Sequence, residues 1–284
     1  MNGRITFVID DSNCQCGLTD RLKAAVGLCY IALKNNLDYK FIHIAGFDMR
    51  DYLAPNKIQW SAEPTDGIEY APNAQMIRYV APYDDLPIFG NDINYICREY
   101  IGNNVLEWWN VPDWQRKWRE LFWDMFAPTD IVVNEMNASR IEGEYTAVVV
   151  RFINSLGYTE NADYNAPFPY GIQNEIIEAV LQRIEEIKMK ASSPLVVYSD
   201  SRRFLTKAKE RGYVITDIEG VGNIMNGDPG TYVILRNFVN LFQIAQAKEV
   251  YSILHLDGFP DNCLYKTQYP RYAAIIGDKP FIRV

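Results

Sequence analysis

Residues 145–158 read YTAVVVRFINSLGY, and the expected fold is built outward from this stretch. Residues 146–150 are all apolar or β-branched, a pattern typical of a strand buried on both faces of a sheet. Arg151 ends the run with a permanent cation. A loop is indicated directly afterwards by Asn154, Ser155 and Gly157.

Two interpretations of Arg151 follow from its position. The carboxyl end of a central parallel strand is where open α/β sheets bind their ligands, and a planar guanidinium suits phosphate better than a lysine does. Alternatively, Arg151 forms an ion pair with a carboxylate at a seam between domains. Position and residue type leave both interpretations open.

The composition is that of a globular chain of one large or two ordinary domains. The chain has 284 residues, 48% hydrophobic and 23% charged, with a formal net charge of −8. We therefore expect no nucleic-acid partner. No apolar run approaches the roughly 18 residues that span a bilayer, so we expect at most peripheral membrane association. Five cysteines, an odd number, and the absence of a signal-peptide pattern predict free thiols and a cytoplasmic location.

The first half opens with a β-loop-α-β pattern. An apolar run at 4–9, a helical periodicity at 18–35 and a second apolar run at 39–45 predict the start of a parallel sheet. Residues 48–87 are rich in proline and turn signals and show no regular pattern. Trp114 and Trp118 belong to an apolar stripe at helical spacing, which predicts a core helix. Trp108 and Trp109 are left open between a core role and sugar stacking.

The second half alternates strands and helices more regularly. We expect a helix around 172–187, a strand at 194–198, a helix at 202–211 closed by Gly212, a strand at 213–216, a helix at 231–247, a strand at 249–253, a helix at 269–277 and a strand at 280–284. The predicted fold is therefore α/β, with two facing doubly wound domains at 1–140 and 141–284. The polar stretch 134–143 is expected to join them. An unrelated α/β enzyme would instead show a single sheet.

Four segments carry a resemblance to a known family. Gly17-Leu18-Thr19-Asp20-Arg21-Leu22 is similar to an early Gly-Leu-Gly-Asn/Asp-Arg-Leu segment, and Val149-Val150-Arg151-Phe152-Ile153-Asn154 to a His-x-Arg-x-Gly-Asp/Asn motif. Tyr198-Ser199-Asp200-Ser201 resembles a strand ending in Thr/Ser-Asp, and Thr267-Gln268-Tyr269-Pro270-Arg271-Tyr272-Ala273 a Ser-x-Phe-Ser-x-Phe-Ala segment. Together, in this order, they resemble the fucosyltransferase-like GT-B glycosyltransferase superfamily.

The resemblance implies a metal-independent inverting glycosyltransferase that uses a nucleotide sugar, GDP-fucose or a related GDP-sugar, in surface glycan synthesis. Arg151 would bind the diphosphate, and its charge would act most strongly as the leaving group departs. The nucleotide-sugar site would lie in the second domain and the acceptor site in the first. The implied donor-binding residues are Gly17, Arg21, Asn154, Ser199, Asp200, Thr267 and Tyr269. The resemblance implies neither a cofactor nor a metal, and Cys14-x-Cys16 is too short and isolated for a zinc site.

The catalytic base and the activity itself are left open by the residues. Asp10 and Asp11 are candidates for the base that activates the acceptor hydroxyl, and a structural turn is the alternative. Val149, Ile153 and Pro270 stand where the family motifs have histidine, glycine and serine. These departures keep a second hypothesis open, a non-catalytic relative that binds a nucleotide or glycan within a glycan-assembly complex.

Overall fold

The chain is described from a computed structural model. The structure describes residues 3–10, 17–63, 74–77, 90, 93–98, 104–152, 155–156, 167–216 and 230–284. The chain forms two compact units, which divide between Val133 and Asn134. We call the unit built on the residues up to Val133 unit 1, and the unit that begins at Asn134 unit 2.

Unit 1 is built on a parallel sheet. Its strands are β1 (Arg4–Ile9), β2 (Asp38–His43), β4 (Ala74–Ile77) and β5 (Asn94–Cys97), in the order β2-β1-β5-β4. β1 and β2 are the two strands that the opening of the sequence predicts. Both strands are largely buried, and Phe7 on β1 stacks on Phe41 on β2 with ring centroids 5.2 Å apart.

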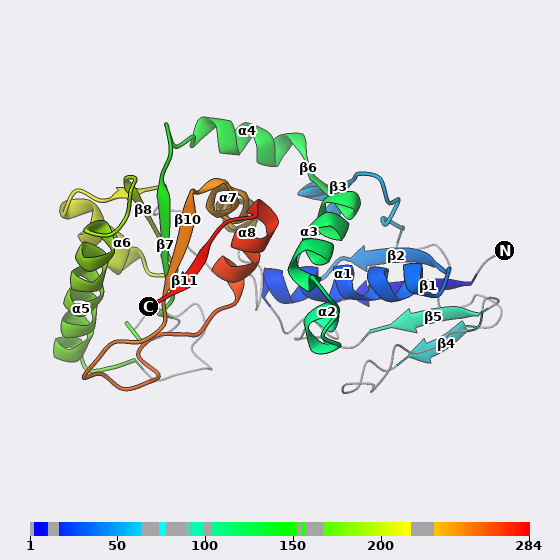
Figure 1. The fold of residues 1–284 in the computed structure, drawn as a ribbon, viewed down its shortest axis with the longest axis horizontal. Coiled ribbons are helices and arrows are strands. Elements are labelled where there is room, and N and C mark those ends of the chain that lie inside the picture. The colour runs from blue at the N-terminus through cyan, green and yellow to red at the C-terminus, as the bar shows by residue number, and fades with distance from the viewer. Residues whose placement is uncertain are drawn as a thin grey trace. The chain divides into compact units, whose positions relative to one another are not determined.

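Three helices of unit 1 pack against one another beside this sheet (Figure 1). They are α1 (Leu18–Lys34), α2 (Val105–Trp108) and α3 (Trp114–Met125). The predicted apolar stripe forms the inner face of α3, where Trp118 is fully buried. A 3-10 turn (Met49–Asp51) leads into β3 (Leu53–Pro55), which pairs antiparallel with β6 (Phe126–Pro128).

The stretch predicted to join the two domains is partly helical. Part of the polar stretch 134–143 belongs to a helix, α4 (Asp130–Ala138), which continues across the division between the units. Glu135 on this helix accepts a hydrogen bond from the buried Arg236, with 3.0 Å between the atoms. The helix is thus held by a contact distant in sequence, which local periodicity does not reveal.

Unit 2 contains five parallel strands. They are β7 (Thr146–Val150), β8 (Leu195–Ser199), β9 (Val214–Ile215), β10 (Glu249–Ile253) and β11 (Phe281–Arg283), in the order β11-β10-β7-β8-β9. β7 is the central strand, and all five of its residues are buried. The opening interpretation of residues 146–150 as a strand buried on both faces is confirmed.

Helices cover both faces of the unit 2 sheet (Figure 1). α5 (Tyr170–Lys188) and α6 (Arg202–Glu210) lie on one face, and α7 (Thr231–Gln246) and α8 (Tyr269–Gly277) on the other. The core under α5 and α6 joins Val148 and Val150 to Ile177 and Ile184. α7 and α8 approach closely at Gly277, where an added Cβ would lie 1.8 Å from the Ala245 carbonyl oxygen. The predicted α/β class with doubly wound parallel sheets is confirmed.

Candidate functional site

The carboxyl ends of β7 and β8 bring two predicted site residues together. Val150 pairs with Ser199 in the sheet register, so Arg151 and Asp200 are the first residues beyond two neighbouring parallel strands. Ser199 accepts a hydrogen bond through its side-chain oxygen from the Ser201 amide, at 3.2 Å. Ser201 in turn caps α6 by accepting from the Phe204 amide, at 3.3 Å. The local Ser-Asp-Ser sequence therefore fixes the turn that carries Asp200.

Arg151 and Asp200 form an ion pair. Nε of Arg151 lies 3.5 Å from Oδ2 of Asp200, and the other carboxylate oxygen accepts a hydrogen bond of 2.8 Å from the Phe152 amide. The exposed fractions of the two side chains are 20% and 14%. The carboxylate partner of Arg151 thus belongs to unit 2 itself. Within the described part of the chain, no residue accepts a hydrogen bond from the terminal nitrogens of Arg151.

A segment before α8 lies against Arg151. The Tyr265 amide donates to the Arg151 carbonyl oxygen at 2.7 Å, and the guanidinium carbon lies 5.2 Å from the centre of the Tyr265 ring. Thr267 is buried, and its side-chain oxygen accepts from the Tyr269 amide at 3.2 Å. Two predicted residues, Thr267 and Tyr269, therefore lie on the segment that contacts Arg151.

The Tyr269 hydroxyl donates a hydrogen bond to the Asn237 carbonyl oxygen on α7, at 2.6 Å. Burial raises the pKa of Tyr269, and the nearby positive charges of Arg236 and Arg151 oppose that rise. Tyr269 is thus held protonated at neutral pH, and it anchors the start of α8 to α7.

The predicted unit 1 residues lie where β1 and β2 end and α1 begins. Gly17 precedes α1, and its carbonyl oxygen accepts from the amides of Asp20 and Arg21. The Arg21 side chain is fully buried, with Nη1 2.6 Å from Nε2 of His43 and 3.5 Å from the Ala45 carbonyl oxygen. These contacts give Arg21 a role in the interior of unit 1, and its contact with a donor stays a prediction.

His43 is neutral in this arrangement. Its Nδ1 lies 3.1 Å from the Phe47 carbonyl oxygen, so Nδ1 carries the proton and Nε2 accepts from Arg21. Burial and the positive charge of Arg21 lower the pKa of His43 to about 3. These contacts give His43 a structural role in the interior of unit 1.

The structure describes only one of the two candidate bases, Asp10. Asp10 follows β1 and forms an ion pair of 3.0 Å with Arg98, with 21% of its side chain exposed. Asp11 lies outside the described residues, and so does Asn154 of the predicted donor site. The Arg98 pair favours the structural alternative for Asp10, and the role of either aspartate as a base stays a prediction.

The described residues contain no group of three or more histidine, cysteine, aspartate or glutamate side chains that could hold a metal ion. Cys29 and Cys263 are buried free thiols and Cys97 is buried, whereas Cys14 and Cys16 lie outside the described residues. No helix in this part of the chain combines the length and the apolar character needed to cross a membrane.

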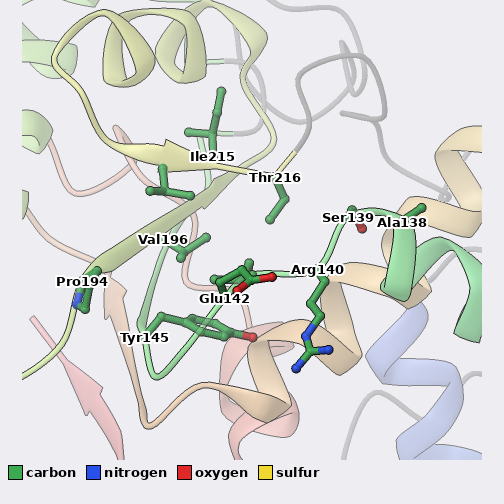
Figure 2. Close-up of a pocket in the computed structure, with 11 residues that line it drawn as sticks. Ala138, Ser139, Arg140, Glu142, Tyr145, Pro194, Val196, Ile215 and Thr216 are labelled. Atoms are coloured by element: carbon green, nitrogen blue, oxygen red, sulfur yellow. The ribbon is translucent and has the colours of Figure 1, made fainter.

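A cavity of about 440 Å³ lies in unit 2, away from Arg151. Residues 138–142 line one side, and residues of β8 and β9 line the other, as Figure 2 shows. Tyr145 and Pro194 precede β7 and β8, so the cavity reaches the amino ends of these strands. It therefore lies at the opposite end of the central strands from Arg151. Arg140 and Glu142, two of its lining residues, are both exposed.

Tyr265 is the site residue that the sequence patterns missed. It precedes the C-terminal segment that carries the resemblance, and it contacts Arg151 although the two are far apart in sequence. An aromatic residue shortly before the segment at residues 267–273 is a weak signal. Only the fold shows which cation it meets.

The fold of this chain, with its two α/β units built on parallel sheets, is similar to that of solved fucosyltransferases. FUT1 of Arabidopsis thaliana, a mutant in complex with GDP, superposes with a TM-score of 0.60 at 12% identity, covering 99% of this chain and 71% of that one. The α-1,6-fucosyltransferase NodZ, soaked with GDP-fucose, superposes with a TM-score of 0.59 at 10% identity, covering 95% and 92%. NodZ from Bradyrhizobium gives 0.60 at 10% identity, covering 96% and 92%.

The fold expected from the resemblance is therefore confirmed. No protein-family model matches the sequence, and no curated protein does.

Proposed function

We propose that this protein is a glycosyltransferase whose donor is a GDP-sugar, GDP-fucose or a related one. One observation carries the proposal. In a fold shared with fucosyltransferases solved with GDP or GDP-fucose, Arg151 lies at the carboxyl end of β7, with terminal nitrogens that no described residue occupies. Two such N–H groups match two oxygens of a diphosphate.

The proposed chemistry follows from this cation. Breaking the bond between the sugar and the diphosphate builds negative charge on the leaving group, and a fixed guanidinium lowers the energy of that state more than the energy of the bound donor. Unit 2 is the proposed donor side and unit 1 the acceptor side. The reaction inverts the anomeric carbon, needs no metal, and serves surface glycan synthesis in the cytoplasm.

Nucleotide binding is tested first. We expect GDP to stabilise the wild-type protein in a thermal-shift titration, with UDP as the comparison nucleotide. Arg151→Ala should weaken GDP binding about ten- to hundredfold, the loss expected for hydrogen bonds to a charged group. Arg151→Lys should recover only part of it, since lysine lacks the fork. Arg183→Ala is the matched control, because Arg183 is another partly exposed arginine of unit 2, paired with Glu186 and Asp257.

Turnover is tested second. Release of GDP from GDP-fucose, with and without candidate glycan acceptors, measures catalysis, and proton NMR of the product reports the anomeric configuration. Asp10→Asn and Asp11→Asn test the base. The variant that lacks the true base should lose turnover and keep its affinity for GDP. Unchanged GDP binding in Arg151→Ala would contradict the proposal.

A second function is favoured by the motif departures. Val149, in the motif position of a histidine, is a buried residue of β7, and Pro270 is buried in the first turn of α8. Neither side chain can exchange a proton or donate a hydrogen bond to a substrate. A non-catalytic partner in a glycan-assembly complex would show GDP binding that depends on Arg151 and no release of GDP from any GDP-sugar.

A further inference from the structure

Arg151 is contacted by two residues that leave one edge of its guanidinium without a hydrogen-bond partner among the described residues. Asp200 lies at the Nε edge, at 3.5 Å, and the guanidinium carbon lies over the Tyr265 ring, 5.2 Å from the ring centre. The remaining edge carries Nη1 and Nη2. This is the edge that can donate two parallel hydrogen bonds to one anionic group.

Asp200 determines which edge of the Arg151 guanidinium stays available to a ligand. Its Oδ1 accepts from the Phe152 amide at 2.8 Å, and this bond fixes the carboxylate relative to the backbone next to Arg151. Oδ2 is thereby directed toward Nε. The side chain of Arg151 cannot turn its Nη edge inward without losing this pair.

Tyr265 contacts Arg151 through its backbone as well as through its ring. Its amide is bonded to the Arg151 carbonyl at 2.7 Å, and its own carbonyl accepts from the Thr267 amide at 2.8 Å. The backbone of Tyr265 is therefore hydrogen-bonded to the backbone of Arg151, and its ring contacts the side chain of the same residue. Tyr265 remains 43% exposed, so it borders solvent. A cation over an aromatic face gains about 0.5–2 kcal/mol, depending on how far water is excluded.

We propose that Tyr265 is a positioning residue, which holds the guanidinium of Arg151 in the plane that presents Nη1 and Nη2 to two oxygens of the donor diphosphate. The proposal rests on the proposed function and deepens it. Tyr265 acts through Arg151 and forms no bond to the substrate. Its aromatic ring matters and its hydroxyl does not, because no hydrogen bond links that hydroxyl to any described residue. Without the ring, the guanidinium samples other planes, and ordering it again on binding costs affinity.

The test is a double-mutant cycle on GDP affinity, measured by titration calorimetry on the full chain. We expect Tyr265→Leu to weaken GDP binding about three- to tenfold, as loss of one cation–π contact implies. Tyr265→Phe should restore wild-type affinity. In the Arg151→Ala background, Tyr265→Leu should cause no further loss. Lys266→Ala, an exposed neighbour on the same segment, is the control for general disturbance of the loop.

The outcomes separate the two proposals. If Arg151→Ala binds GDP like the wild type, the proposed function fails. If Arg151→Ala loses affinity while Tyr265→Leu does not, the function stands and the positioning role is overturned. An equal loss from Tyr265→Leu in both backgrounds also overturns that role, because a residue acting through Arg151 cannot act in its absence. Circular dichroism melting of Tyr265→Leu confirms that the folded protein is being compared.

Discussion

Nη1 of Arg21 and Nε2 of His43 lie 2.6 Å apart in the interior of unit 1, and this contact requires a neutral imidazole. The pKa of His43 falls to about 3, through burial and the charge of Arg21, while the Phe47 carbonyl and Asp48 act in the opposite direction. Protonation of His43 would place two cations in contact inside the fold.

The first prediction concerns acid stability. The pKa of a histidine in an unfolded chain is about 6.5, so between pH 6.5 and 3 the unfolded state binds a proton that the folded state does not. His43 therefore contributes full stability above pH 6.5, and this contribution decreases by up to about 1.4 kcal/mol per pH unit as the pH falls. Urea unfolding of the wild type and of His43→Gln from pH 7.5 to 4.5 measures it.

The difference in unfolding free energy between wild type and His43→Gln should shrink as the pH falls. His255→Gln is the control, since the His255 side chain is 54% exposed, and it should follow the wild-type pH profile. A difference between wild type and His43→Gln that stays constant with pH would show that His43 titrates normally in the fold.

The second prediction concerns the contact between α7 and α8. Gly277→Ala should destabilise the protein by about 1–3 kcal/mol, the usual cost of overpacking, because its Cβ would meet the Ala245 backbone. Gly171→Ala is the matched control: Gly171 lies in α5, and an added Cβ there has no atom within 4 Å. It should be neutral or stabilise by up to about 1 kcal/mol. Equal denaturation midpoints for the two variants would argue against the close approach.

The third prediction concerns Arg236, which is 1% exposed on α7. Its Nη1 donates to Glu135 and to Ser139, at 3.0 Å each. Arg236→Met should reduce the unfolding free energy by about 1–3 kcal/mol, because the change removes the donor to Glu135 and Ser139, which are themselves only partly buried. Arg183→Met removes a partly exposed pair and should cost less than about 1 kcal/mol. Similar losses of unfolding free energy in the two variants would mean that burial of Arg236 does not increase the contribution of its hydrogen bonds to stability.

The fourth prediction concerns metal ions. If Arg151 supplies the positive charge at the diphosphate, the GDP dissociation constant should be unchanged when the protein is treated with a chelator and when Mg²⁺ is added back. Titration calorimetry with and without EDTA, on wild type and on Arg183→Ala as a control for surface charge, measures this. A tenfold loss of affinity in EDTA would instead place a cation at the donor diphosphate.

The sequence predicted unit 2 in detail because its elements carry their own local signals. The valine run of β7, the Ser201 cap of α6 and the closing Gly212, whose φ is +82°, all identify their positions without reference to the fold. The structure confirms these elements. The apolar periodicity of the sequence likewise identifies β1, α1 and β2, and the structure confirms them.

Other features depend on contacts that no local pattern records. The second half of α4 belongs to a stretch that is polar in sequence, and its Glu135 accepts a hydrogen bond from Arg236. The place of β5 between β1 and β4 is a matter of sheet order, which strand propensity does not specify. At the site, Arg151 and Asp200 could be proposed because each ends a recognisable strand. Their mutual pairing and the support from Tyr265 required the register of β7 with β8 and the path of the segment before α8.

The segment from Leu254 to Gln268 begins at one rigid element, β10, and ends at another, α8, so its two ends are fixed independently of what lies between. Gly258 is exposed in its middle and has a φ of +84°, whereas Tyr265 near its end is tied to Arg151. Variation in length or composition around Gly258 would therefore leave the contacts between Tyr265 and Arg151 intact. The segment from β10 to α8 thus combines an exposed part, which can vary, with a part whose backbone is bonded to the end of the central strand.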